Sequence, residues 1–233
     1  MNTSFADIEK KENRKDLIIS ICVFSCFAQL YYFQPLLPDL AKDFILSASE
    51  SSFAISFSTL GMVFGLFTTM FVADRIPRKK MIGTGLLSSS IFSVAASFSP
   101  TFLPLILLSA AKGFLLSGAT SVSMAYIAEE VSSRNKGKIM GLYIAGNALG
   151  GMAGRVISSW IGALYTWRIA SVSIGLICAL FAILFLLFSP RSTNFMPRKE
   201  SFHTLIIANL QLITSKALIP FYLTGGLILG VFV

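Results

Sequence analysis

The stretch GMVFGLFTTMFVADRIPRKK, Gly61 to Lys80, decides the fold of this chain. Its first part ends an apolar run from about Ser51 to Ala73, which is long enough to cross the roughly 30 Å hydrocarbon core of a bilayer as a helix. Charged residues then crowd into a short loop, and a second apolar run begins at Met81. Pro77 favours a reversal of the chain in that loop because its ring fixes φ. The stretch therefore predicts two membrane-spanning helices joined by a short charged loop.

Apolar runs of similar length recur on both sides of this stretch. Of 233 residues, 55% are hydrophobic and 13% charged, whereas soluble domains have about 45–50% apolar and about 25% charged residues. The mean hydropathy is +0.76. We therefore expect an all-α integral membrane protein, with six spans at Leu17 to Pro38, Ser51 to Ala73, Met81 to Phe98, Phe102 to Ala128, Ile139 to Tyr165 and Trp167 to Phe188. A seventh begins near Ala217 and is still apolar at Val233, which predicts a truncated helix.

These runs divide the chain into four segments. Residues 1–16 are polar, residues 17–188 hold the six spans, residues 189–216 form a loop, and residues 217–233 are the truncated seventh span. The loop contains SFHTLIIANLQLITSK, an amphipathic stretch that fits the surface of a membrane. The first run ends in YYFQPLLP and lacks a small-residue cleavage site, so we interpret it as a retained helix and not as a signal peptide.

The basic residues predict the orientation of the spans. Loops on the cytoplasmic side of membrane proteins carry an excess of Lys and Arg. Most of the 19 basic residues precede the first span or follow the second, fourth and sixth. The opposite loops hold only Lys42 and Arg168, and Lys112 and Arg155 fall inside spans. The N-terminus is therefore expected in the cytoplasm, with the chain in a bacterial-type inner membrane.

Several classes of function are disfavoured by the residues. An enzyme is not expected, because the sequence offers no nucleophile–base pair, no metal-spaced His and Cys cluster and no phosphate loop, and its one histidine is His203 in a loop. A nucleic-acid binder would gather its basic residues on one soluble face. The cysteines, Cys22, Cys26 and Cys178, all lie in apolar runs and are interpreted as packing residues. No metal and no cofactor are predicted.

The charged loop resembles the signature loop of the major facilitator superfamily, a family of secondary transporters. That signature ends in Asp-Arg-x-Gly-Arg-Arg/Lys, and Asp74, Arg75, Arg78 and Lys79 match it, with Pro77 in place of the glycine. The alternative is that these charges only fix the orientation of the spans, as basic residues in cytoplasmic loops do. The order Gly-x-x-x-Gly, then Asp-Arg, then Arg-Lys favours the family.

The fifth run, GLYIAGNALGGMAGRVISSWIG, carries a second resemblance, to the Gly-Pro-x-x-Gly-Gly motif of the drug–proton antiporter branch. Gly146, Gly150 and Gly151 match, and Asn147 replaces the proline. Gly146, Gly150 and Gly154 lie four residues apart and form a flat stripe that lets another helix backbone approach closely. Ordinary packing between helices through small residues is the alternative interpretation of this stripe. Gly61 and Gly65 repeat this spacing in the second span.

The resemblance implies the N-terminal half of the superfamily fold, a six-helix bundle of two inverted three-helix repeats, plus the start of helix 7. It implies a transporter that works by alternating access, with proton-coupled efflux of a small molecule. It further implies that Arg78 or Arg75 pairs with Glu129 or Glu130. Asp74 is expected to dock on a helix of a second half, which is either the missing C-terminal half or a second chain.

Ionisable side chains inside a membrane are costly and count as candidates for function. Lys112 and Arg155 both lie about 10 residues from the periplasmic ends of their spans. A rise of 1.5 Å per residue therefore puts both roughly 15 Å deep in the membrane. We expect both to line the central cavity and either to bind an anionic substrate or to pair with carboxylates of the missing half. The alternative is a structural pair partner or a side chain that snorkels to the membrane surface. Weaker candidates from the same region are Gln34, Tyr32 and Asn147. The opposing reading of the whole chain is a truncated, non-transporting fragment.

Overall fold

The computed structural model describes residues 20–131, 135–189 and 217–232, with short pieces at 192, 195–197, 211 and 214–215. All regular secondary structure within these residues is helical, as the apolar runs predict. The chain divides into two compact units, residues 1–196 and 197–233, which we describe separately. The polar segment 1–16, His203 and most of the expected amphipathic stretch lie outside the described residues.

The helices follow the expected spans closely. After a first helix at residues 20–31, the structure has η1 (Gln34–Leu36), α2 (Leu37–Asp43), α3 (Ala48–Ser51), α4 (Phe53–Val72), η2 (Ala73–Arg75), α5 (Arg78–Ser97), α6 (Phe102–Glu130), α7 (Lys136–Leu164), α8 (Trp167–Phe188) and α10 (Ile219–Phe232). The short signature loop thus becomes one 3-10 turn between α4 and α5.

The first span is longer than its sequence predicts. It continues past Pro38 as one helical segment, Ser20–Asp43. Pro35 and Pro38 each sit in the first two positions of a new helical piece, η1 and α2. Proline is tolerated there because those backbone N–H groups lack a partner within the helix in any case. The two prolines therefore restart the helix instead of ending it.

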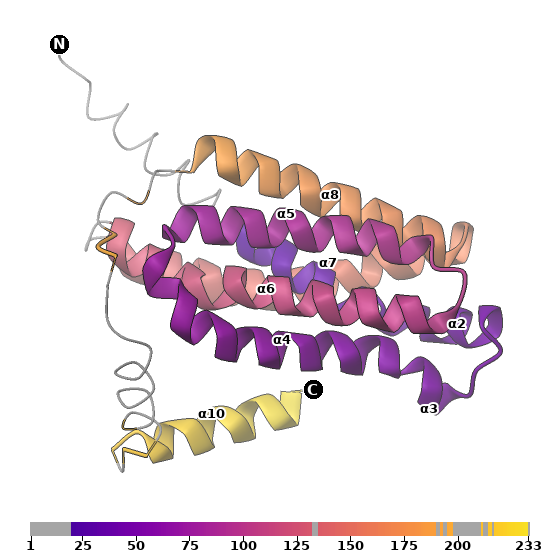
Figure 1. Cartoon of the computed structure of the whole chain (residues 1–233), viewed down its shortest axis with the longest axis horizontal. Helices are drawn as coiled ribbons and strands as arrows, with labels where there is room; N and C mark the ends of the chain where they lie inside the picture. Colours follow the sequence, from indigo (N-terminus) through magenta and orange to yellow (C-terminus); the bar gives the residue numbers. More distant parts are fainter. Residues whose placement is uncertain are drawn as a thin grey trace. The chain divides into compact units, whose positions relative to one another are not determined.

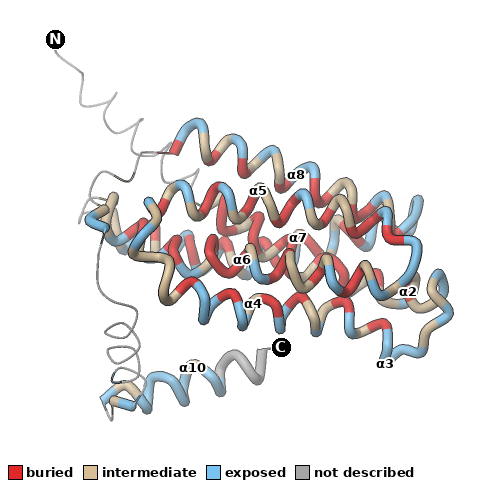
Figure 2. Tube along the Cα trace, viewed as in Figure 1, coloured by how far each residue is buried: buried red, intermediate tan, exposed pale blue. Residues whose placement is uncertain are grey.

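The unit that holds residues 20–189 is a bundle of long, roughly parallel helices. α8, α5, α6 and α4 lie side by side, α5 contacting both α6 and α8, and α7 packs on α8 (Figure 1). Buried positions form a stripe along each helix, turned toward its neighbours (Figure 2). Two apolar clusters fill the interior, one around Tyr126 and Phe185 and one around Tyr32, Phe33 and Trp167.

Four helical segments among the described residues are long and apolar enough to cross a membrane: Ser20–Asp43, Ala48–Arg75, Phe102–Glu130 and Trp167–Phe188. α5 and α7 have the length, with 20 and 29 residues, but are less apolar. α5 carries a run of serines and a basic first turn, and α7 is rich in glycine. Both use small residues for packing against other helices, which lowers their hydropathy.

Candidate functional site

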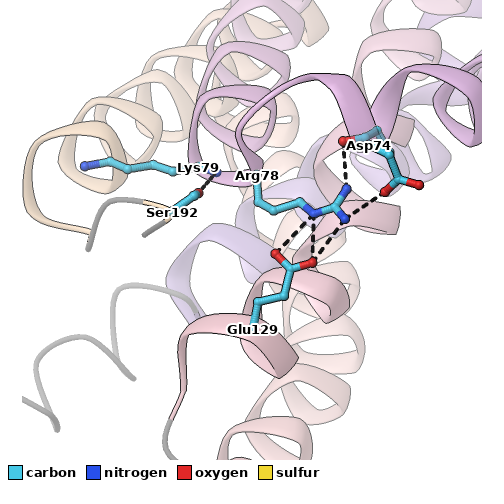
Figure 3. Close-up of polar contacts among 6 residues, drawn as sticks. Asp74, Arg78, Lys79, Glu129 and Ser192 are labelled. Carbon is cyan, nitrogen blue, oxygen red and sulfur yellow. Dashed lines mark hydrogen bonds and ion pairs between the residues drawn. The ribbon is translucent and has the colours of Figure 1, made fainter. Parts of the chain in front are cut away.

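An ion cluster centred on the buried Arg78 ties the signature loop to the end of α6 (Figure 3). Arg78, the first residue of α5, binds Asp74 through Nη2 at 2.9 Å and Glu129 through Nη2 at 3.0 Å. Its Nε donates to both carboxylate oxygens of Glu129, at 3.2 and 3.3 Å, and its Nη1 donates to the carbonyl of Ala73 at 2.7 Å. Only 10% of the Arg78 side chain is exposed, so the fork is held within the protein. Burial opposes the charge, but the bonds to Glu129 and Asp74 outweigh it and keep the pKa of Arg78 above its usual value.

The residue after Arg78 joins the same loop to the end of α8. Lys79 donates its backbone N–H to Ser192 Oγ at 2.9 Å, and its ammonium reaches the carbonyl of Ser189 at 2.6 Å. The ring of Phe195 lies 5.0 Å from the Arg78 guanidinium. The signature loop is thus anchored to α6 and to the segment after α8. Of the other expected participants, Arg75 is exposed in η2 and Glu130 is partly buried at the end of α6.

Lys112 lies inside the bundle. It is 1% exposed, and its ammonium rests 4.5 Å from the ring centre of Tyr32 and 4.7 Å from that of Phe33. Within the described part of the chain its Nζ has no hydrogen-bond partner. A cation over aromatic faces gains about 0.5–2 kcal/mol, which does not repay the removal of an ammonium from water. Lys112 is therefore an uncompensated buried amine.

Arg155 lies at the same level of the first span but at an open surface. Its guanidinium is 4.7 Å from the ring centre of Tyr31, the residue before the aromatic pair that holds Lys112. Together with Pro35 and Trp160 it borders a hollow of about 570 Å³. Its Nε is buried without a partner among the described residues. The two cations therefore share a depth, and Arg155 borders a hollow.

The three weaker cavity candidates differ in how deeply they are buried. Tyr32 is fully buried, and its hydroxyl is 2.8 Å from Ser171 Oγ. Gln34 is partly buried at the start of η1. Asn147 is partly buried in α7, and its Oδ1 has no partner within the described residues.

Sequence reasoning missed a polar network beside Lys112. Gln29 donates to Ser90 Oγ at 3.1 Å and accepts from Ser89 and Ser93 at 3.1 and 3.3 Å. Ser171 then donates to the carbonyl of Ser93 at 2.9 Å and meets the Tyr32 hydroxyl. The run of serines in α5 is the signal that could have revealed this network, because hydroxyl groups that face lipid would lack hydrogen-bond partners.

A second ion pair, also missed, lies at the opposite end of the bundle from the signature loop. Arg168 binds Asp43 at 3.0 Å, and Trp167 Nε1 donates to the same carboxylate oxygen at 2.9 Å. Arg168 Nη1 also donates to the carbonyls of Ser97 and Ser99, at 2.7 and 3.0 Å. This group, which we call the Arg168 clamp, joins the ends of α2 and α5 to the start of α8.

The candidate glycines lie where helix backbones meet. A Cβ on Gly154 would lie 2.6 Å from the carbonyl oxygen of Ala28 in the first helix, and Gly150 and Gly146 face the same helix one and two turns away. Gly151 instead faces Tyr31. In α4, Gly61 and Gly65 face the backbone of α6 in the same manner. The structure thus places these stripes at contacts within the bundle.

Comparison with known proteins assigns the chain to a family. The family described as Major Facilitator Superfamily matches residues 19–233. The inner membrane transport protein YnfM of Escherichia coli is 35% identical over 220 residues, which cover 92% of this chain and 52% of that protein. An uncharacterized transporter of Buchnera aphidicola is 34% identical over 230 residues, covering 97% and 56%. The chain spans about half the length of the curated relatives it matches.

Solved structures give the same fold. The proton:xylose symporter XylE superposes with a TM-score of 0.72 at 15% identity, covering 90% of this chain and 51% of that one. A bacterial homologue of the human lysosomal transporter Spinster gives a TM-score of 0.68 at 16% identity, covering 82% and 46%. At such low identity the similarity supports the fold alone.

Proposed function

The chain belongs to the major facilitator superfamily, and on this premise we propose that it is the substrate-handling half of a proton-coupled transporter that exports a small anionic molecule. Curated relatives over nearly the whole chain are named transporters, so transport of a small solute across a membrane is the starting point. Alternating access in such proteins rocks two bundles around a site near the middle of the membrane. One such bundle is present in this chain.

The observation that carries the proposal is Arg155. Its half-buried guanidinium lies beside a hollow, and its Nε has no partner in the part of the chain that the structure describes. Such a group is suited to a carboxylate or phosphate, because its planar fork binds these groups in a bidentate manner. Gln34 and Asn147 are the polar groups that we assign to the same site. Lys112, behind the aromatic pair, adds positive potential to the site, which favours an anion.

Export and proton coupling rest on the antiporter-like glycine motif of α7. We place the signature loop and the N-terminus in the cytoplasm on the strength of the basic residues around them. In this arrangement the Arg78 cluster holds Asp74 at the cytoplasmic edge, where it can dock on the N-terminus of a helix from the second half. Alkaline phosphatase fused after Tyr165 should be active, and fused after Ser189 inactive; the reverse pattern contradicts this orientation.

The transport proposal can be tested in liposomes. The chain is reconstituted alone and together with the C-terminal half of YnfM, and a pH dye inside the vesicles reports proton movement when a panel of organic anions is added. We expect one or more anions to drive proton movement in the paired sample. Arg155→Gln should reduce the response at least about tenfold and Arg155→Lys should restore part of it, because the charge is kept and the fork is lost.

A second candidate, a non-transporting fragment, is favoured by one observation, the match to only about half of each relative. No anion-driven proton movement in either sample supports this candidate. Movement with the chain alone rejects it and indicates that two copies replace the two halves.

A further inference from the structure

A groove of about 300 Å³ lies on the surface of the bundle between α4, α5 and α6. It runs from the signature loop, at Val72 and Ile76, toward the middle of the helices, at Gly65 and Phe114. At 1.5 Å per residue, the part along α4 alone is about 10 Å long. Three of its lining residues, Gly65, Gly85 and Gly118, are glycines. This groove has no part in the site proposed above.

Three of the five hydroxyl groups that line the groove are bonded to their own helices. Thr68 donates to the carbonyl of Phe64 at 3.0 Å and Thr84 to that of Lys80 at 2.7 Å. Ser117 donates to the carbonyl of Phe114 at 2.6 Å. Because these donors are used, the walls of the groove suit a hydrocarbon better than a polar solute.

The surface around the groove is apolar as well. Phe64 and Phe67 on α4 are 62% and 59% exposed, and Phe114 on α6 is 41% exposed. Large exposed aromatic side chains on membrane-spanning helices face hydrocarbon or another apolar surface. The groove thus opens onto an apolar surface of the bundle.

One end of the groove is positively charged. Lys80 is exposed and lies one helical turn before Thr84 and two before Ser88, so it continues the face of α5 that lines the groove. Arg75, also exposed, directly precedes Ile76 at the same end. Each basic residue at the membrane interface strengthens the binding of an anionic headgroup about fivefold. An apolar groove that ends in such residues has the polarity of a phospholipid with a negative headgroup.

We propose that this groove binds one anionic phospholipid, with an acyl chain lying between α4 and α5 on the floor formed by α6 and the phosphate against Lys80. An acyl chain gains little free energy by moving from one apolar environment to another. The affinity therefore comes from the fit of the acyl chain in the groove and from the charge of the headgroup. Lipid held beside the signature loop would then contact the segment whose position the Arg78 cluster fixes.

The test uses the full chain purified in detergent, mixed with phosphatidylglycerol or with phosphatidylcholine of identical acyl chains, and native mass spectrometry to count retained lipid. Wild-type protein should retain one phosphatidylglycerol at concentrations where phosphatidylcholine is lost. Lys80→Gln should weaken phosphatidylglycerol binding about fivefold. Thr84→Phe, which fills the groove from an exposed position, should weaken it at least about threefold.

Matched controls make the same changes elsewhere. Lys136→Gln removes a charge from the start of α7, and Leu60→Phe enlarges an exposed side chain of α4 outside the groove; both should bind as wild type does. Equal retention of the two lipids overturns the headgroup contact, and unchanged binding by Thr84→Phe overturns the groove. If Thr84→Phe loses helicity, Thr68→Phe on the opposite wall replaces it, with the same two outcomes.

Discussion

Lys112 carries an amine into the bundle without a counter-charge from the described residues. Its ammonium meets two aromatic rings, and the nearby polar groups, Gln29 and the serines of α5, bond to one another. A carboxylate in that position would make a structural ion pair. No such carboxylate is among the described contacts of Lys112, so the bundle itself does not offset the cost of burying the charge. Ionisable residues inside a membrane that carry this cost are usually functional.

Replacing Lys112 by Met should therefore stabilise the isolated chain. Met has a similar length and fills the space between the two rings without a charge, and such replacements of buried ions gain about 1–4 kcal/mol. We expect the thermal midpoint in detergent to rise and anion-driven transport in the paired sample to fall. Lys42→Met, at an exposed position, should change the free energy of unfolding by less than about 0.5 kcal/mol. A lower midpoint for Lys112→Met would mean that the amine has a structural role.

At the scale of helices, glycine decides how closely the first helix and α7 approach. Gly150 and Gly154 face the backbone of the first helix, so any side chain there pushes the two apart. Gly137 and Gly141, in the first turns of the same α7, have nothing within 4 Å of a Cβ. One helix thus holds both packed and free glycines.

This contrast gives opposite expectations for two alanine substitutions. Gly141→Ala should raise stability by up to about 1 kcal/mol, because alanine forms helices better than glycine and meets no neighbour. Gly154→Ala should lower it by about 1–3 kcal/mol, because the methyl group overlaps the backbone at Ala28. Unfolding of each variant in detergent, followed by circular dichroism, measures the difference. Equal effects at the two positions would show that the first helix and α7 are not in contact.

The sequence predicts the helices well because each needs only a local apolar run. It also marks the signature loop and the glycine stripes, since their spacing is local. It cannot name partners that are distant along the chain: Arg168 and Asp43 lie 125 positions apart, and Gln29 and Ser90 lie 61 apart. It also places Lys112 and Arg155 at one depth without revealing that consecutive aromatic residues separate a buried cation from one beside a hollow.

At the scale of the whole bundle, the two ion groups occupy equivalent places in the inverted repeat. The first span, α4 and α5 correspond to α6, α7 and α8. Arg78 begins α5 and pairs with Glu129 at the end of α6; Arg168 begins α8 and pairs with Asp43 at the end of the first span. Each group therefore joins the third helix of one repeat to the first helix of the other, at opposite ends of the bundle.

If the two groups fasten separate ends, their contributions to stability should add. Arg78 and Ser97, the carbonyl partner of Arg168, are about 28 Å apart along α5. Arg78→Gln leaves two carboxylates facing each other and should cost about 2–3 kcal/mol, whereas Arg168→Gln breaks a more exposed pair and should cost about 1 kcal/mol. Denaturation of both single variants and the double variant gives the coupling, which should stay within about 0.5 kcal/mol of zero.

A double-mutant cycle within the Arg78 cluster provides a reference for the coupling between Arg78 and Arg168. Arg78→Gln and Glu129→Gln remove the two sides of one contact, so the double variant should cost clearly less than the two single costs added, with a coupling of about 1 kcal/mol or more. Coupling of that size between Arg78 and Arg168 would contradict independent ends. It would mean that α5 behaves as a rigid rod on which both ends depend, so that releasing the signature loop loosens the opposite end of the bundle.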